Sequence, residues 1–249
     1  MTGARFTTPV RVVLLDIEGT TTPIDFVHNV LFPYARARVK DYLIEHQANA
    51  DVQSDIAGLM AEHAADAERS LQPPPLDDPL SEARLDPLAA YVHWLMDQDR
   101  KSTPLKSLQG KIWEAGYQAG DLLAPVFADV QRAFVRWRGQ QRDICIYSSG
   151  SRLAQQLLFA HTDAGDLRAH IRDYFDTRVG AKRDAESYQG IAATLNRESS
   201  DIVFVSDVTA ELDAAHAAGL LTVLCVRAGN PAQPASTHCV IHTFDDLLP

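Results

Sequence analysis

Acidic residues follow an apolar run near the start of the chain, and their spacing suits phosphoryl or metal chemistry. The run 12–15 (Val-Val-Leu-Leu) ends at Asp16, and Glu18 comes two residues later. A short apolar run bounded by turn residues is typical of a buried strand in a parallel sheet. In such sheets the chemistry takes place beyond the carboxyl ends of the strands. Asp16 is therefore a candidate nucleophile, a candidate metal ligand, or both.

Two later apolar runs, 144–147 and 202–205, also end in polar residues, and a lysine lies between them. Each feature alone is weak, because a serine or an aspartate before a helix is usually an N-cap. In this order, with each group at the end of a predicted strand, they form a stronger set. Its members are Ser148, Ser149, Gly150, Lys182, Asp207 and Glu211.

The chemistry that this set suits is phosphoryl transfer. A phosphate monoester is doubly negative, so a site that hydrolyses it must stabilise charge. Asp16 can attack phosphorus and form an aspartyl phosphate. Mg²⁺ between Asp16 and Asp207 would relieve their repulsion, with Glu211 bracing the metal's surroundings. The serines and nearby helix amides can hold phosphoryl oxygens, and Lys182 can neutralise another.

The rest of the sequence predicts the elements that position these residues. Strand patterns alternate with helical patterns, which indicates an α/β fold with a doubly wound parallel sheet. The expected strands are 10–15, 143–147, 174–177, 202–206, 221–226 and 240–243. The expected helices between them are 130–138, 152–159, 187–195 and 210–218.

A long segment separates the first strand from the second and has no strand pattern. About 130 residues lie between Asp16 and Ser148, whereas a crossover needs only about a dozen. We therefore expect residues 28–129 to form an inserted all-helical cap domain, and residues 1–27 and 130–249 to form a discontinuous catalytic core. The expected cap helices are 35–45, 51–69, 85–96 and 105–116, with Pro73–Pro75 and Pro79 as breakers.

Composition narrows the class of partner. The chain has 249 residues, is 46% hydrophobic and carries a formal charge of −10, which argues against a nucleic acid as its main partner. Three cysteines without a CxxC pair fit a reducing compartment. No stretch approaches the roughly 18 apolar residues of a membrane span. We expect a cytoplasmic protein with no membrane partner.

The four polar groups together resemble a known family. Asp16-x-Glu18-Gly19-Thr20, the serine pair with Gly150, Lys182 and Ser206-Asp207-x3-Glu211 are similar to the four motifs of haloacid dehalogenase-like hydrolases. That family usually has aspartate, as general acid/base, where this chain has Glu18. The variant Asp-Ile-Glu-Gly-Thr-Thr-Thr-Pro-Ile closely resembles the enolase-phosphatases (acireductone synthases) of methionine salvage, and the resemblance runs nearly end to end.

This resemblance implies a Rossmann-like core, Mg²⁺, a monomer and a two-step reaction. The implied substrate is a small phosphorylated diketone, 2,3-diketo-5-methylthiopentyl-1-phosphate. It would be enolised and then dephosphorylated to the acireductone 1,2-dihydroxy-3-keto-5-methylthiopentene. The implied catalytic residues are Asp16, Glu18 and Lys182. The implied metal positions are Asp16, Glu18 and Asp207, and the implied substrate-binding positions are Ser148, Ser149, Gly150 and Lys182.

Two parts of the site stay open at this level. Enolisation needs a base, and Glu18 is only the nearest candidate. The candidate substrate contacts in the cap are Lys106, Gln109, Lys111 and Trp113. Of these, Trp113 also fits a core stripe with Leu105, Leu108 and Ile112, and the core interpretation is the stronger one.

Two alternatives to the enolase-phosphatase hypothesis follow from the same residues. One is another phosphatase or phosphomutase of the same superfamily, acting on a different small phosphate ester. The other is a binding or regulatory protein on this fold, in which Glu18 marks lost catalysis. The presence of Asp16, Lys182 and Asp207 together weighs against the second alternative.

Overall fold

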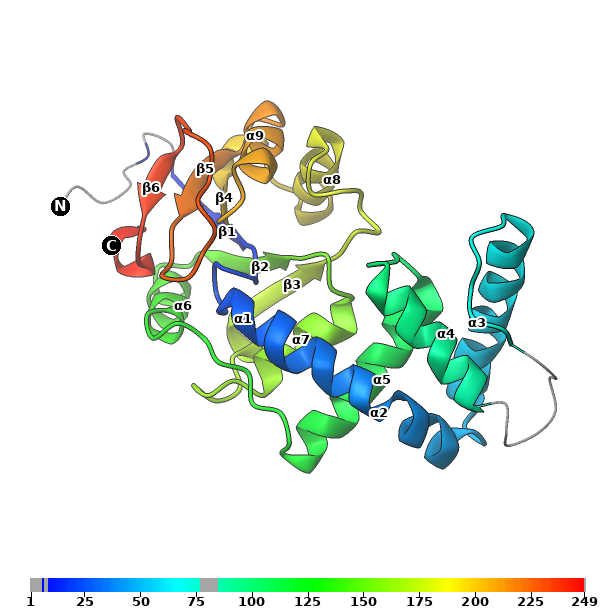
Figure 1. Cartoon of the computed structure of the whole chain (residues 1–249). Coiled ribbons are helices and arrows are strands. Elements are labelled where there is room, and N and C mark those ends of the chain that lie inside the picture. The colour runs from blue at the N-terminus through cyan, green and yellow to red at the C-terminus, as the bar shows by residue number, and fades with distance from the viewer. Residues whose placement is uncertain (1–5, 7–8, 77–84, 249) are drawn as a thin grey trace. The chain divides into compact units, whose positions relative to one another are not determined.

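The structure is a computed structural model that describes residues 6, 9–76 and 85–248. The chain divides into two compact units (Figure 1). Met1–Val27 and Leu122–Pro249 form one unit, here called the α/β unit. His28–Asp121 form the other, here called the helical unit. The predicted insertion of a helical domain into an α/β core is confirmed.

The α/β unit contains a parallel sheet of six strands in the order β3-β2-β1-β4-β5-β6. β1 lies between β2 and β4, so that Leu15 is level with Ile146 on one side and with Val205 on the other. The chain therefore reverses its direction across the sheet beside β1, and such a switch point opens a crevice at the strands' carboxyl ends. The strands are β1 Val12–Leu15, β2 Asp143–Tyr147, β3 Ile171–Phe175, β4 Ile202–Ser206, β5 Leu221–Cys225 and β6 Cys239–Ile241.

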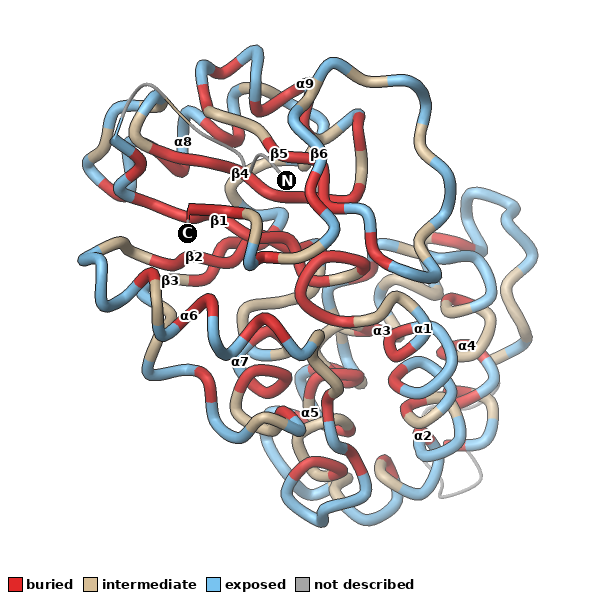
Figure 2. Tube along the Cα trace, turned by 90° about the vertical axis from the view of Figure 1, so that its left-hand side faces the viewer, coloured by how far each residue is buried: buried red, intermediate tan, exposed pale blue. Residues whose placement is uncertain are grey.

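Helices cover both faces of the sheet and explain why its central strands are uniformly apolar. α8 (Ala185–Leu195) and α9 (Thr209–Ala217) lie on one face, with α6 (Val130–Gly139) and α7 (Arg152–Ala160) on the other (Figures 1 and 2). All four residues of β1 are completely buried. Burying side chains of this size stabilises the fold by about 1.5–3 kcal/mol each.

The third strand differs from its predicted position, 174–177. β3 begins at Ile171, which is level with Ile144 of β2, and it ends at Phe175. Arg172 and Asp173 lie in its first half, because β3 is an edge strand and tolerates polar side chains there. The apolar pattern therefore begins later than the strand does. The last strand also differs slightly, at 239–241 instead of 240–243.

The helical unit contains four main helices around its own apolar core. They are α2 Phe32–His46, α3 Ala50–Glu68, α4 Leu85–Asp97 and α5 Thr103–Ala119. Asn49 caps α3 and Ser102 caps α5, each by accepting a hydrogen bond from a first-turn amide. No strand occurs in the described part of this unit. Pro79, one of the predicted breakers, lies outside the described residues.

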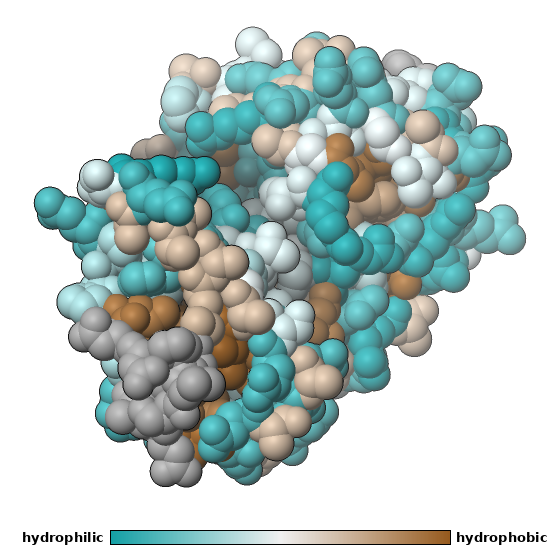
Figure 3. Space-filling view, turned by 90° about the vertical axis from the view of Figure 1, so that its right-hand side faces the viewer, coloured by the Kyte–Doolittle hydropathy of each residue, from teal (hydrophilic) through white to brown (hydrophobic). Residues whose placement is uncertain are grey.

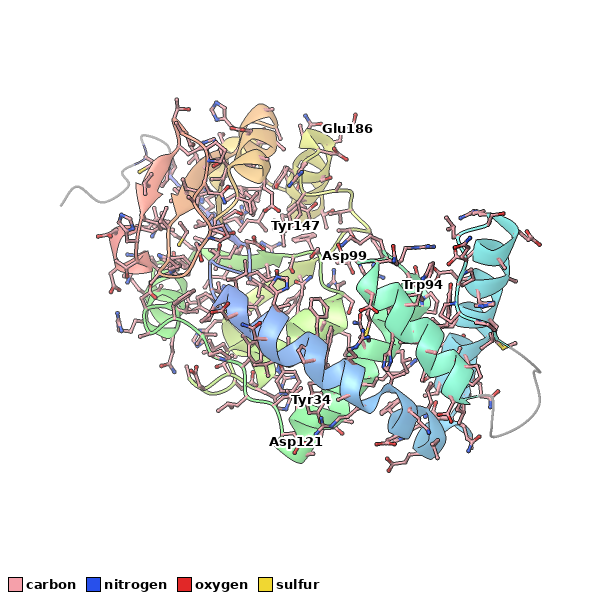
Figure 4. The ribbon with its side chains drawn as sticks, in the orientation of Figure 1. Tyr34, Trp94, Asp99, Asp121, Tyr147 and Glu186 are labelled. Atoms are coloured by element: carbon pink, nitrogen blue, oxygen red, sulfur yellow. The ribbon has the colours of Figure 1, made fainter. Side chains whose placement is uncertain are left out.

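The two units meet in sequence at two junctions. The first falls between Val27 and His28, where helix α1 (Ile24–Phe26) is followed by the π-helix η1 (Val27–Leu31) and then α2. The second falls after Asp121, earlier than the predicted boundary after residue 129. The Tyr34 hydroxyl donates to Asp121 at 3.0 Å within the helical unit (Figure 4).

Residues 122–129 belong to the α/β unit because their backbone bonds to it. The Ala124 amide donates to the His161 carbonyl at 2.8 Å, and the Phe127 amide donates to the Thr21 carbonyl at 3.0 Å. This stretch lacks both helical and strand periodicity, so the sequence pattern could not place the boundary.

Hydrophilic residues predominate on the face shown in Figure 3, with hydrophobic residues in small patches between them. Among the helices of the described residues, none has the length and apolar character that crossing a membrane requires.

A buried ion pair stabilises the α/β unit. Arg227, after β5, donates to Asp129 at 2.8 Å, and both side chains are less than a tenth exposed. Asp129 also accepts from the Thr243 hydroxyl at 3.0 Å and from the Phe244 amide. Burial alone would raise the pKa of Asp129, but these hydrogen bonds and the guanidinium outweigh it and lower the pKa.

Replacing this carboxylate should destabilise the fold strongly. We expect Asp129→Ala to lower the free energy of unfolding by about 3–5 kcal/mol, because it leaves Arg227 buried without its counter-charge. Asp245→Ala, which removes an exposed pair with Arg132, should cost no more than about 1 kcal/mol. Urea unfolding of the wild type and of the two variants at neutral pH measures this difference in the free energy of unfolding.

The same comparison has a defined pH dependence. Since folding lowers the pKa of Asp129, its stabilisation is present above the ordinary carboxyl pKa and is lost as pH falls through the lowered value. The gap between wild type and Asp129→Ala should therefore shrink in acid. A gap that widens as pH falls would contradict the assigned role of the pair.

Candidate active site

Asp16 lies where β1 ends and is held on both sides. Its amide donates to the Val205 carbonyl at 3.0 Å, so the ladder to β4 extends to this residue. Its Oδ1 accepts from the Ile17 amide at 2.7 Å and from the Lys182 ammonium at 2.8 Å. The Asp16 residue is 5% exposed. The carboxylate is therefore fixed at the carboxyl end of the central strands.

The turn after Asp16 closes tightly on itself. The Ile17 carbonyl accepts from the amides of Thr20, Thr21 and Thr22 at 2.9–3.2 Å. Within this turn Glu18 is partly exposed, while its neighbours on both sides are buried. The Glu18 side chain is therefore the one in this turn with the best access to solvent.

Gly19 lets this turn approach the residue that follows β4. Its φ is +67°, and a Cβ built on it would lie 2.3 Å from Asp207 Oδ2, closer than any real contact allows. A larger residue here would be strained by the positive φ and would displace the Asp207 side chain. The first and fourth predicted motifs therefore meet here, as expected for the ends of the neighbouring strands β1 and β4.

Lys182 lies between two carboxylates. Its Nζ is 2.8 Å from Asp16 Oδ1 and 2.6 Å from Glu211 Oε2, and the side chain is 10% exposed. Burial alone would lower the pKa of Lys182, but the two carboxylates outweigh it and raise the pKa. Lys182 is therefore protonated and serves as the counter-charge of the site.

Aromatic hydroxyls fix the loop that carries Lys182. Tyr188 of α8 donates to the Lys182 carbonyl at 2.7 Å. Tyr147 at the end of β2, labelled in Figure 4, donates to the Gly180 carbonyl at 3.0 Å. The lysine does not belong to a helix or strand, yet its backbone is held from two elements. Its ammonium is thereby placed between carboxylates of β1 and α9.

Asp207 and Glu211 add negative charge that Lys182 alone does not balance. Burial and the charge of Asp16 raise the pKa of Asp207 to about 7. Burial and Asp16 also raise the pKa of Glu211, against the opposing effect of Lys182. Buried carboxylates resist ionisation unless a cation stabilises them. The site has three carboxylates around one ammonium, so it favours a further cation.

The donor set fits Mg²⁺ that is shared with a phosphate. Mg²⁺ usually binds one or two carboxylates and completes its shell with waters and phosphate oxygens. Asp16 and Asp207, at the ends of adjacent strands, supply two such carboxylates. In the part of the chain that the structure describes, no three His, Cys, Asp or Glu side chains form a closed metal site. The assignment of Glu18 as a third metal position stays a prediction.

The serine segment follows β2 and begins α7. The Ser148 amide donates to the Phe175 carbonyl at 3.2 Å, and Ser148 Oγ accepts from the Gly150 amide at 3.2 Å. Ser148 is buried, whereas Ser149 is exposed. Gln155 Nε2 donates to the Gly150 carbonyl at 2.8 Å, which fixes the loop from the helix. Because β2 adjoins β1 in parallel, this helix N-terminus lies at the same carboxyl end of the strands as Asp16.

The four residues predicted as cap contacts all belong to α5 of the helical unit. Lys111 forms an ion pair with the buried Asp55 and donates to Ser107 Oγ at 3.2 Å, so its charge is balanced inside this unit. Trp113 Nε1 donates to the Leu31 carbonyl at 2.8 Å, and its ring packs against the helical core, as the core interpretation predicts. Gln109 is buried and Lys106 is half-buried. Substrate contact by any of the four stays a prediction.

Sequence reasoning placed Ser206 in the fourth motif without giving it a role, and it did not single out Arg227 or Asn230. Ser206 is fully buried, and its hydroxyl lies 3.0 Å from Glu211 Oε2 and 3.3 Å from Asp16 Oδ2. Arg227 and Asn230, after β5, donate to carbonyls of the first turn. The available signal was polar residues after the carboxyl end of another strand, the same signal that identified Asp16 and Asp207.

The fold and the site define a class of protein. The family model of haloacid dehalogenase-like hydrolases matches residues 10–219. The chain belongs to this family of hydrolases. The family agrees with the two carboxylates, the lysine and the serine segment that gather at the carboxyl ends of the central strands.

The relatives narrow this class to the enolase-phosphatases. The chain is 49% identical over 238 residues to Enolase-phosphatase E1 of Synechococcus elongatus, covering 96% of this chain and 98% of that protein. It is 45% identical over 240 residues to Enolase-phosphatase E1 of Methylococcus capsulatus, with coverage of 96% and 98%. The crystal structure of the UTR4 protein of Saccharomyces cerevisiae superimposes with a TM-score of 0.78 at 32% identity, covering 95% of this chain and 99% of that one.

Adding one methyl group at Gly19 tests the close approach to Asp207. We expect Gly19→Ala to destabilise the protein by about 1–3 kcal/mol, because φ is positive and the new Cβ collides with the carboxylate. Hydrolase activity should fall with it, since Asp207 must move. Thermal unfolding and turnover of an aryl phosphate measure the two effects.

The matched control is Gly190→Ala in the interior of α8, where a Cβ meets no atom within 4 Å. This change should stabilise the protein by about 0.5–1 kcal/mol and leave turnover intact. Equal effects of the two substitutions would show that the turn does not depend on glycine.

Proposed function

We propose that this chain is an Mg²⁺-dependent enolase-phosphatase. It converts 2,3-diketo-5-methylthiopentyl-1-phosphate, through the enol phosphate, to the acireductone 1,2-dihydroxy-3-keto-5-methylthiopentene. The observation that carries the proposal is the Asp16 carboxylate held by Lys182 beside Asp207, in a chain 49% identical to a curated enolase-phosphatase over nearly its full length. The enzyme acts as a monomer in the cytoplasm.

Asp16 is the nucleophile for the phosphatase step. Its Oδ1 is occupied by two short hydrogen bonds, from Lys182 and from the Ile17 amide. The nearest donor to Oδ2 is Ser206 Oγ at 3.3 Å, and that hydroxyl lies closer to Glu211. Oδ2 is therefore the oxygen that attacks phosphorus and forms the aspartyl phosphate.

Glu18 moves the protons of that step. It donates a proton to the ester oxygen as the phosphorus–oxygen bond breaks, and the enol product leaves. It then takes a proton from the water that attacks the aspartyl phosphate, which releases inorganic phosphate and restores Asp16. The partial exposure of Glu18 in an otherwise buried turn supports this role, because water must reach it.

Asp16 and Asp207 would hold the metal, with Glu18 as the third predicted position. When bound, Mg²⁺ supplies positive charge to the phosphate and an electrophile to the substrate carbonyl. Lys182 contributes a fixed charge to the phosphate oxygens. Ser148, Ser149 and Gly150, at the start of α7, bind the remaining oxygens through hydroxyl and amide donors.

Enolisation requires removal of a proton from the carbon beside a carbonyl. Glu18 is the nearest carboxylate to Asp16 in the first turn and is the candidate base. Asp207 is less suited because it is buried, and Glu211 is less suited because it pairs with Lys182, whereas Glu18 is partly exposed. The same side chain would then act in both half-reactions.

The order of the two half-reactions can be observed directly. With the diketo phosphate, the wild type should show enol absorbance that rises before phosphate is released, as followed by stopped-flow absorbance and a phosphate assay. Asp16→Asn should release no phosphate above background, because an amide cannot form the aspartyl phosphate. Asp245→Asn, on the surface, is the control.

Other outcomes favour other functions. Wild-type phosphate release by Asp16→Asn would exclude the nucleophile. Equal efficiency on unrelated phosphate esters would favour a different phosphatase or phosphomutase. No turnover of the diketo phosphate or of an aryl phosphate, with Mg²⁺ present, would favour a binding protein.

Glu18→Gln separates proton transfer from metal and substrate binding. We expect both enolisation and phosphate release to slow by about 10²–10⁴, because the amide keeps the shape of Glu18 but cannot carry the proton. Single-turnover absorbance measures the first rate and phosphate release the second. Rapid enolisation with slow phosphate release would assign the enolisation base to another residue.

A further inference from the structure

The loop between β5 and β6 contacts the first turn at two successive carbonyls. Asn230 Nδ2 donates to the Gly19 carbonyl at 2.8 Å, and Arg227 Nε and Nη2 each donate to the Thr20 carbonyl at 3.2 Å. No residue of this loop belongs to the four family-like motifs. It nevertheless bonds the backbone immediately after Asp16 and Glu18.

Asn230 lies beside both Gly19 and Asp207. A Cβ at Gly19 would be 3.0 Å from Asn230 Oδ1 and 2.3 Å from Asp207 Oδ2. The Asn230 amide nitrogen faces the Gly19 carbonyl, which fixes the orientation of its side chain. The turn is therefore confined between the amide of Asn230 and the carboxylate of Asp207.

Arg227 anchors this loop rigidly. Its side chain is 5% exposed and pairs with Asp129, and its guanidinium lies 4.4 Å from the Phe127 ring centroid and 4.6 Å from that of Phe244. The backbone N–H of Asn230 in turn donates to the Arg227 carbonyl at 3.2 Å. The position of Asn230 thus follows from a buried, stacked arginine.

The same loop also reaches the segment behind Asp207. Gln233 Oε1 accepts from the Thr209 amide at 3.2 Å, at the start of α9. One loop therefore bonds to the turn that follows Asp16 and to the helix that follows Asp207. Through the neutral side chains of Asn230 and Gln233, the loop connects the two carboxylate-bearing segments.

We infer that Asn230 is a positioning residue for the divalent-cation site, and that its hydrogen bond to the Gly19 carbonyl holds the first turn against Asp207 at the spacing that the cation requires. The inference rests on the proposed use of Asp16 and Asp207 as Mg²⁺ ligands. Groups that orient metal ligands typically change metal affinity by about 10–100-fold when they are removed.

Mg²⁺ titrations of the full chain test this inference. The variants are Asn230→Ala, which removes the amide, and Asn230→Leu, which keeps most of its volume but cannot donate. Mg²⁺-dependent thermal stabilisation reports binding without substrate or turnover. We expect the apparent Kd for Mg²⁺ to rise about tenfold in both variants. With an aryl phosphate, the half-saturating Mg²⁺ concentration should rise in parallel, while turnover at saturating Mg²⁺ recovers.

Thr222→Val is the matched control, because it removes a side-chain hydrogen bond from the same sheet. Thr222 Oγ1 bonds His238 Nδ1 at 2.8 Å near the start of β5, whereas Asn230 follows the end of that strand. This variant should lower the melting temperature without changing the Mg²⁺ affinity. A purely structural role for Asn230 would give the same result as the control.

The outcomes separate this inference from the proposed function. Wild-type Mg²⁺ affinity in either folded Asn230 variant overturns the inference, and if one variant does not fold the other decides. Absence of Mg²⁺ binding by the wild type overturns the inference and the proposed cofactor together. Weakened Mg²⁺ binding without turnover of the diketo phosphate supports the inference and counts against the proposed substrate.

Discussion

The Lys182 ammonium lies between the carboxylates of Asp16 and Glu211, and the arrangement of the site depends on this contact. Carboxylates removed from water are costly unless a cation is close and the geometry is good. Lys182 meets both conditions, at 2.8 and 2.6 Å. The single charge of Lys182 does not compensate the third carboxylate, Asp207. This excess of negative charge makes the carboxyl end of the central strands costly to bury. It also makes the site suited to Mg²⁺ and a phosphate.

Neutral hydrogen bonds hold these charges in place. Tyr188 and Tyr147 fix the backbone around Lys182, Ser206 bridges towards Glu211 and Asp16, and Asn230 holds the carbonyl of Gly19. None of these groups adds a net charge, so they position the ionic groups without changing their balance. A frame of polar contacts that extends through β2, β4, α8 and the β5–β6 loop thus positions the charged groups.

Much of the fold was predictable because burial leaves a clear pattern in the sequence. Central strands covered on both faces are continuous apolar runs, so β1, β2 and β4 were located, and predicted site residues follow them directly. The edge strand β3 was misplaced because Arg172 and Asp173 break that pattern. The second junction was placed too late because residues 122–129 are held by backbone hydrogen bonds, which side-chain periodicity does not record.

The sequence by itself determined the order of the site: a carboxylate, a serine pair, a lysine and a second carboxylate, each after a predicted strand or on a loop between them. It also determined the family, through Glu18 and the residues around it. Only the tertiary structure decided which charges pair, why glycine is favoured at position 19, and that Lys111 is balanced by Asp55. It alone revealed Arg227 and Asn230. The physical reason is that strand order brings together residues far apart in the chain, and hydrogen bonds to backbone carbonyls leave no trace in the type of the accepting residue.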